Sequence, residues 1–200
     1  MSHWDEKYGA APDGLFGREA NQYLREIVAR SDFAARSALC LADGDGRNSR
    51  WLALKGIETT AVDASAVATR NALALDEASG VSVERIVADL ETWRPAGRRR
   101  YDAVLLMYFQ GPTALRRHAL RVGWDALAPG GWLVVEAFAK AQEDRPGGPD
   151  TPDHLYDLGE IAAALPGHRA LESLAGRIRL DEGRRHQGEV EVVRFLAAKP

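Results

Sequence analysis

The feature that most constrains the fold is an apolar run that breaks directly into a Gly-x-Gly turn. Residues 38–48 read Ala-Leu-Cys-Leu-Ala-Asp-Gly-Asp-Gly-Arg-Asn, which is typical of a buried strand, a tight turn and the start of a helix. A second apolar run ends in Asp63, which follows Gly44 by 19 residues. This is close to the roughly 20-residue spacing at which a carboxylate reaches the hydroxyls of a bound ribose. The pattern predicts a ligand-binding strand-turn-helix unit.

Alternating strand and helix patterns continue through most of the chain. Continuous apolar runs separated by helical periodicity predict a parallel sheet covered on both faces, a doubly wound α/β fold. Near the end, two strand-like runs flank Asp181-Glu182-Gly183 and predict an antiparallel hairpin. The expected strands are 38–42, 58–63, 82–87, 102–107, 132–138, 169–180 and 188–198, and the expected helices are 14–31, 47–56, 65–78, 113–127 and one near 155–165.

Composition excludes several classes of protein. The 200 residues are expected to form one domain, 1–200, and a formal charge of −3 gives no overall attraction to nucleic acid or anionic membrane. The amino terminus is polar, and no apolar run approaches the roughly 20 residues of a membrane span. The single cysteine, Cys40, allows no intramolecular disulfide and disfavours a metal site. We expect a cytoplasmic protein, without metal, as a monomer or homodimer.

Several separated motifs occur in the order found in one enzyme family. The chain resembles the class I S-adenosylmethionine-dependent methyltransferases, in particular the small group that includes tellurite-resistance and thiopurine-type enzymes. The matching segments are Trp4-Asp5-Glu6-Lys7-Tyr8, Phe16-Gly17-Arg18-Glu19-Ala20-Asn21, the glycine loop Leu39–Asn48, Asp63, Val87-Ala88-Asp89-Leu90, and Leu127-Ala128-Pro129-Gly130-Gly131. The resemblance implies a Rossmann-like, doubly wound, seven-stranded, mainly parallel sheet with an antiparallel C-terminal hairpin, and S-adenosylmethionine as cofactor.

The resemblance also places the cofactor contacts. Asp63 would accept hydrogen bonds from both ribose hydroxyls, Asp89 corresponds to the residue that accepts from the adenine amino group, and Arg47 suits the ligand's carboxylate. Cys40 stands where many class I enzymes have an acid, so Asp43 is the carboxylate nearest the turn. The expected cofactor-binding residues are Asp43, Gly44, Gly46, Arg47, Asn48, Asp63, Ala64, Asp89, Leu90, Met107 and Tyr108.

The methyl acceptor is expected on the amino-terminal and hairpin side of that site. A small molecule with a soft nucleophilic atom, a thiol or a selenium or tellurium oxyanion, needs no dedicated base. Tyr108 and His186 are the candidate catalytic side chains, and the proline- and glycine-rich segment 140–154 is a candidate lid. The expected acceptor-binding residues are Trp4, Tyr8, Phe16, Gln110, Arg185 and His186.

Other interpretations remain open at this point. The Gly-x-Gly can be a simple turn, and Asp63 can cap the helix that starts at Ser65. The aromatic residues can be ordinary packing, and Arg185 and His186 can be solvated turn residues. A non-catalytic S-adenosylmethionine-binding module and a nicotinamide-dependent oxidoreductase are alternatives. The oxidoreductase is disfavoured because Ser49 holds the third fingerprint position and no Tyr-x-x-x-Lys pair follows.

Overall fold

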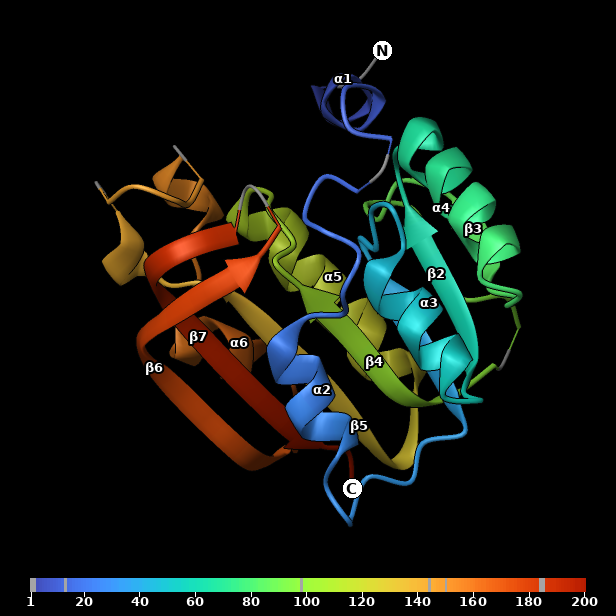
Figure 1. The fold of residues 1–200 in the computed structure, drawn as a ribbon. Coiled ribbons are helices and arrows are strands. Elements are labelled where there is room, and N and C mark those ends of the chain that lie inside the picture. The colour runs from blue at the N-terminus through green and yellow to red at the C-terminus, as the bar shows by residue number, and fades with distance from the viewer. Residues whose placement is uncertain (1–2, 13, 98, 144, 150, 184–185) are drawn as a thin grey trace.

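The computed structural model describes residues 3–12, 14–97, 99–143, 145–149, 151–183 and 186–200 and shows a seven-stranded sheet (Figure 1). The strands lie in the order β3-β2-β1-β4-β5-β7-β6. Their bounds are β1 Ser37–Leu41, β2 Glu58–Asp63, β3 Glu84–Val87, β4 Tyr101–Met107, β5 Leu127–Phe138, β6 Arg169–Glu182 and β7 His186–Ala198. The first five pair in parallel, whereas β7 pairs antiparallel with both β5 and β6. The predicted fold class is confirmed.

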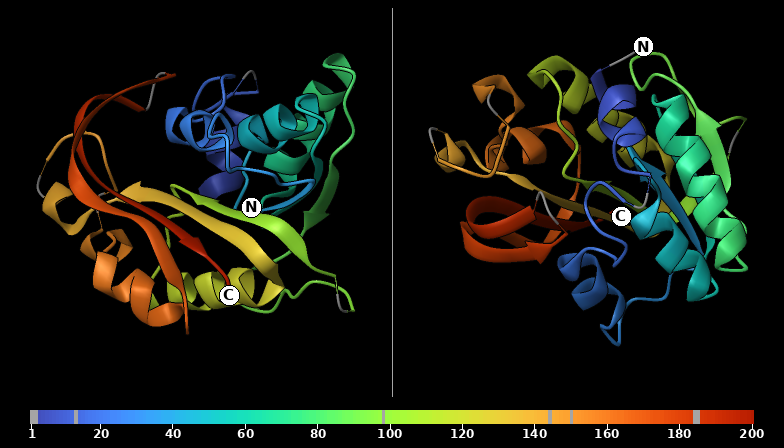
Figure 2. Two further views of the ribbon diagram at one scale, coloured as in Figure 1. Left: turned by 90° about the horizontal axis from the view of Figure 1, so that it is seen from below. Right: turned by 45° about the horizontal axis from the view of Figure 1, so that its top comes forward.

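Helices cover both faces of the sheet, as its side-chain alternation requires. On one face, α2 (Gln22–Val28) and α3 (Arg47–Leu54) pack on Ala38 and Cys40 of β1. On the other face, α5 (Thr113–Ala126) and α6 (Leu158–Ala164) pack in the core that contains Leu39 and Leu41. Alternate residues of β1 therefore face opposite layers. Figure 2 shows α5 and α6 on the side of the sheet opposite the amino-terminal helices, and α4 (Ala66–Ala78) lies beyond α3 (Figure 1).

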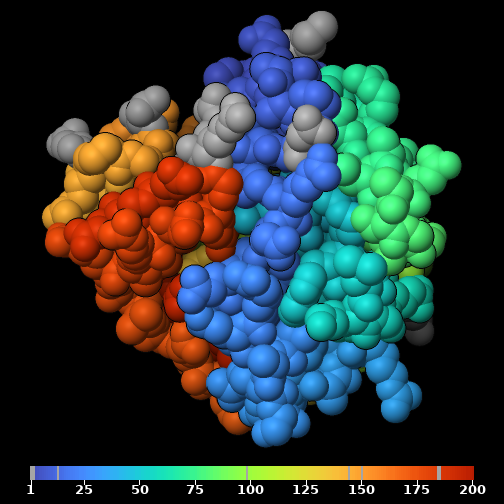
Figure 3. All heavy atoms as spheres, viewed as in Figure 1, coloured from blue at the N-terminus to red at the C-terminus, as the bar shows by residue number. Residues whose placement is uncertain are grey.

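The amino-terminal segment differs from the expectation of a helix over 14–31. Only Gln22–Val28 is helical, and a separate α1 occupies His3–Gly9. Gly14 and Gly17 have φ of 117° and 85°, in the left-handed region, which ends any helical path through them. Asn21 then starts α2, because its Oδ1 accepts from the Leu24 amide at 2.9 Å. The segment crosses the surface between α3 and the β6–β7 hairpin (Figure 3).

Two further boundaries differ from expectation. Asp181 and Glu182 belong to β6, where Glu182 pairs with His186, so the hairpin turn is shorter than predicted. β5 begins at Leu127 and takes in Pro129-Gly130-Gly131, which were expected to separate helix from strand. Leu127 pairs with Tyr101 of β4, but the next pair is Trp132 with Ala103, so Pro129-Gly130-Gly131 lie in an irregularity of the strand.

The candidate lid segment contains two single-turn 3-10 helices, η1 Lys140–Gln142 and η2 Pro152–His154, where no regular structure was expected. Arg116 of α5 holds the end of this segment. Its guanidinium donates to the carbonyl oxygens of Asp153 and Leu155, the second at 2.9 Å, and also to that of Gly111 at 2.8 Å. The segment is therefore fastened to α5. Whether it acts as a lid stays a prediction.

Candidate active site

A cavity opens at the carboxyl ends of β1, β2 and β4, where open α/β sheets bind ligands. It contains about 970 Å³ of free space, its mouth included. The structure brings together at its wall these predicted residues: Asp43, Arg47, Asn48, Asp63, Ala64, Asp89, Leu90, Met107 and Tyr108 from the cofactor set, and Trp4, Tyr8, Phe16, Gln110 and His186 from the acceptor set. Gly44 and Gly46 lie within the same loop, and Arg185 lies outside the described residues.

The glycine turn needs its glycines for both conformation and space. Gly44 and Gly46 have φ of 61° and 81°. A Cβ on Gly44 would lie 2.2 Å from the Tyr8 hydroxyl, and one on Gly46 would lie 2.3 Å from Nη2 of Arg85. Ala42 and Tyr108 also have a φ of 53°, which is rare for side chains other than glycine, and both line the cavity. Such conformations cluster at ligand sites.

Asp63 joins the glycine turn to the start of α4. Its Oδ2 accepts from the Gly44 amide at 2.7 Å, and its Oδ1 accepts from the Ser65 amide at 2.8 Å. Burial raises the pKa of Asp63, while these two amides lower it. The cap of α4 itself is Ser65, whose hydroxyl accepts from the Ala68 amide at 3.1 Å. Each Asp63 oxygen keeps a second lone pair, so the carboxylate can accept further hydrogen bonds from a ligand.

Asp43 lies beneath the turn in a buried ionic network. Its Oδ2 accepts from Ser49 Oγ at 2.5 Å and from Arg85 Nη1 at 3.0 Å, and Arg85 Nε also donates to Asp76 at 2.6 Å. Burial raises the pKa of Asp43 to about 6, against the opposing effect of Arg85. The Asp43 side chain is 2% exposed. Its hydrogen bonds with Ser49 and Arg85 stabilise the glycine turn.

Arg47 and Asn48 hold the amino-terminal segment against the loop. Arg47 Nη2 donates to Glu182 at 2.7 Å, and its Nη1 donates to the carbonyl oxygens of Phe16 and Glu19. Asn48 Oδ1 accepts from the Asn21 amide at 2.9 Å. In this structure the Nη groups of Arg47 have protein partners, so its contact with a ligand carboxylate stays a prediction.

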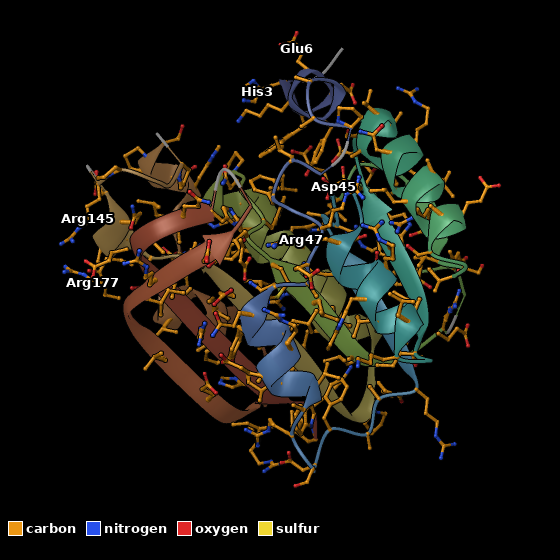
Figure 4. The ribbon with its side chains drawn as sticks, viewed as in Figure 1. His3, Glu6, Asp45, Arg47, Arg145 and Arg177 are labelled. Atoms are coloured by element: carbon orange, nitrogen blue, oxygen red, sulfur yellow. The ribbon has the colours of Figure 1, made fainter. Side chains whose placement is uncertain are left out.

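Sequence reasoning missed two carboxylates of this region. Asp45 lines the cavity, and its Oδ2 accepts from the Leu15 amide at 2.7 Å. Glu182 accepts from the Gln22 amide at 2.7 Å besides Arg47. The signal for Asp45 was available, since it lies inside the Gly-x-Gly turn. Glu182 carried no signal, because Gln22 and Arg47, which donate to it, lie more than 130 positions away in the chain. Figure 4 shows Asp45 and Arg47 beside the start of α3.

The predicted adenine side of the cavity combines one exposed acid with apolar surface. Asp89 is exposed, and its Oδ1 accepts from the Glu91 amide at 2.9 Å. Leu90 is buried and joins the main core, whereas Ala64 is exposed at the rim. A carboxylate beside an apolar wall suits a flat ring that carries an exocyclic donor.

Aromatic rings surround His186 on the opposite side of the cavity. The ring of His186 lies 4.6 Å from that of Phe16 and 4.5 Å from that of Tyr108, between centroids. Its Nδ1 has no hydrogen-bond partner among the described residues and lies 3.8 Å from Oε2 of Glu182. Burial lowers the pKa of His186, which favours the neutral imidazole. Burial raises the pKa of Glu182, but His186, Arg47 and the Gln22 amide outweigh this and lower it to about 2.

The structure also bears on the expected absences. Among the described residues, no cluster of three or more His, Cys, Asp or Glu side chains is arranged to hold a metal ion. None of the helices in the described part of the chain has both the length and the apolar character needed to cross a membrane.

Residues 38–131 match a family model that is described as a methyltransferase domain. No curated protein matches the sequence. A solved structure described as "Conversion of a Disulfide Bond into a Thioacetal Group during Echinomycin Biosynthesis" has a TM-score of 0.70 and 18% identity, over 98% of this chain and 90% of that one.

Two further solved structures share the fold. TehB from Haemophilus influenzae has a TM-score of 0.71 and 14% identity, over 90% of this chain and 62% of TehB. The N-methyltransferase NodS from Bradyrhizobium japonicum WM9 has a TM-score of 0.66 and 18% identity, over 90% and 93% of the two chains. At these identities the likeness shows the fold alone. Residues 38–131 thus match a methyltransferase domain, and the chain shares its fold with TehB and with other proteins described as S-adenosylmethionine-dependent methyltransferases.

Proposed function

We propose that this protein transfers a methyl group to a small molecule with a soft nucleophilic atom, a thiol or a selenium or tellurium oxyanion. It would do so as a single domain over 1–200, as a monomer or homodimer in the cytoplasm, without nucleic acid. The observation that supports the proposal is the cavity itself, which combines an acidic cofactor side with a side lined by the rings of Phe16, Tyr108 and His186. The fold supports the transfer, and the site chemistry supports the choice of acceptor.

The residues present fit S-adenosylmethionine. Asp43, Asp45, Asp63 and Asp89 line the cavity together with one guanidinium, that of Arg47. A mainly acidic lining favours a cationic ligand. Asp63 would hold the ribose hydroxyls, Asp89 and Leu90 would hold the adenine, and the amides of the glycine turn would face the amino-acid tail. When bound, the cofactor supplies a methyl group on an already activated sulfonium.

The chain's own residues then contribute position rather than covalent chemistry. Trp4, Tyr8 and Phe16 cover the cavity and exclude water, and their ring faces attract a positive charge. Gln110 and His186 orient the acceptor beside the cofactor side of the cavity. A thiolate or oxyanion acceptor would already carry the lone pair that attacks, so none of these side chains would need to remove a proton from it. Alignment alone can supply most of the rate acceleration.

The test follows release of S-adenosylhomocysteine with a panel of thiols, selenite, tellurite, phenols and amines. We expect release with members of the first three groups. Release with amines or phenols only would overturn the choice of a soft acceptor, since NodS of the same fold is described as an N-methyltransferase. Absence of a thermal shift with S-adenosylmethionine would overturn the cofactor site, because a bound ligand stabilises the folded state.

His186 gives the sharper test of the acceptor side. We expect His186→Ala to leave the affinity for S-adenosylhomocysteine unchanged and to lower kcat at least fivefold, since its ring lines the cavity between Phe16 and Tyr108. The matched control is His168→Ala, whose ring packs on Phe195 away from the cavity. Equal turnover in the His186 variant would assign that residue to structure alone.

A further inference from the structure

A second cavity adjoins the first on the side of α1. It contains about 950 Å³ of free space, its mouth included, and lies between α1, segment 147–154 and Phe138 at the end of β5. Trp4, Phe16, Gln110 and His186 line both cavities. These four side chains therefore lie at the junction of the two cavities.

The linings of the two cavities differ in charge. Four aspartates line the first, as described above. Lys7, His3 and His154 line the second, and no Asp or Glu does so among the described residues. The Lys7 ammonium and the imidazole N–H donors favour an anion, whereas an acidic lining repels one. Among the described residues, the two linings thus differ in the sign of their formal charge.

The inner wall of the second cavity is aromatic. Trp4, Phe16 and Phe138 contribute rings, and the ammonium of Lys7 lies 4.6 Å from the centroid of the Trp4 ring. The Phe138 ring lies 5.7 Å from that of His186, so the aromatic surface continues to the junction. Gly147 and Gly148 form part of the outer wall without side chains that would fill the space. A flat apolar body fits between these rings.

We propose that the second cavity binds the methyl acceptor and that this acceptor is a small aromatic acid. Its carboxylate lies toward Lys7 and His154, its ring lies against Trp4 and Phe16, and its nucleophilic atom reaches the junction beside Gln110 and His186. The inference rests on the proposed function and specifies its acceptor. An aromatic acid that carries a thiol satisfies both.

The test compares benzoate with benzamide, which have nearly the same shape and differ in charge. Protein saturated with S-adenosylhomocysteine is titrated with each compound, and binding is followed by ligand-observed NMR. We expect benzoate to bind about tenfold more tightly, because a charge-assisted hydrogen bond is stronger than a neutral one. In Lys7→Gln, which removes the ammonium, and in His154→Leu, which removes an N–H donor, that preference should fall below about threefold, since both residues line only the second cavity.

Controls separate this inference from the proposed function. Lys55→Gln, which removes an ammonium that lies over Trp51 away from both cavities, should keep the full preference. S-adenosylhomocysteine affinity, measured by calorimetry, should be unchanged in all three variants. Equal binding of benzoate and benzamide, or binding of neither while S-adenosylhomocysteine binds, would overturn the aromatic-acid proposal alone. Failure of S-adenosylhomocysteine to bind the wild-type protein would overturn the proposed function instead.

Discussion

Replacing Asp63 with asparagine removes one charge and one acceptor oxygen from the centre of the proposed cofactor site. In the wild-type protein both carboxylate oxygens already accept a backbone amide, from Gly44 at 2.7 Å and Ser65 at 2.8 Å. Asparagine has a single acceptor oxygen, so its NH₂ group must face one of these two N–H donors. The variant therefore loses one of the two acceptors for the ribose hydroxyls and one of the two backbone contacts, to Gly44 or to Ser65.

The two losses have different magnitudes for binding and for folding. A hydrogen bond to a charged group contributes about 1.5–3 kcal/mol, so the loss of the ribose contact should weaken binding by roughly 10- to 150-fold. An unsatisfied amide costs about 1–3 kcal/mol of stability. Burial raises the pKa of Asp63, which means that the folded protein pays a desolvation penalty for the charged carboxylate. The neutral amide avoids this penalty, so part of the loss of stability is offset. We therefore expect a large change in affinity and a change in folding stability of about 1 kcal/mol.

The assay is calorimetric titration with S-adenosylhomocysteine, with urea denaturation of the same samples. The matched control is Glu58→Gln, the same chemical change at the other end of β2, where the side chain is 74% exposed and pairs with Arg99. The control should bind like the wild type. An Asp63→Asn affinity within twofold of wild type, in a folded protein, would refute the assignment of Asp63 to the ribose.

Three other variants test the surroundings of the site. Burial raises the pKa of Asp43 to about 6, above its usual value of about 4. The contribution of this carboxyl to the free energy of unfolding therefore falls as the pH rises from about 4 to about 6. The stability of Asp43→Asn relative to wild type should therefore rise by up to about 3 kcal/mol between about pH 4 and pH 7 in urea denaturation, and a pH-independent difference would contradict this. Glu182→Gln removes the carboxylate that pairs with buried Arg47 and should lower the free energy of unfolding by about 2–4 kcal/mol. Glu189→Gln, at an exposed side chain, should lower it by less than about 0.5 kcal/mol. Equal losses in the two variants would show that the Arg47 pair is unimportant. Gly44→Ala should destabilise the protein by roughly 1–3 kcal/mol, because its methyl group meets the Tyr8 hydroxyl. Tyr8→Phe should recover part of that loss in the double variant, and a lack of recovery would place the strain elsewhere.

Glu182 explains why the site needs the whole chain. It accepts hydrogen bonds from Arg47 at the glycine loop and from Gln22 in the amino-terminal segment, and it pairs across the hairpin with His186. The loop, the amino-terminal segment and the hairpin thus meet at one carboxylate. A shift of any of these three elements would move the other two.

Local patterns in the sequence were sufficient for the order of the strands, for the helices that follow β1, and for the loop on the predicted cofactor side. Apolar runs such as 38–42 and 58–63 stand out because a parallel strand must be apolar on both faces. Gly44 and Gly46 stand out because only glycine adopts a positive φ at no cost. These signals lie within a few residues of each other, so they can be read without the fold.

Contacts between distant parts of the chain were decided only by the tertiary structure. Nothing near Glu182 in the sequence indicates its ion pair with Arg47, and nothing near Asn21 indicates that its amide donates to Asn48. The second cavity beside the unpredicted α1 arises in the same way, because Trp4 and Lys7 lie beside Gly147, Gly148 and His154 only in the folded protein. Burial and ion pairing depend on which surfaces come together, and that is a property of the assembled fold.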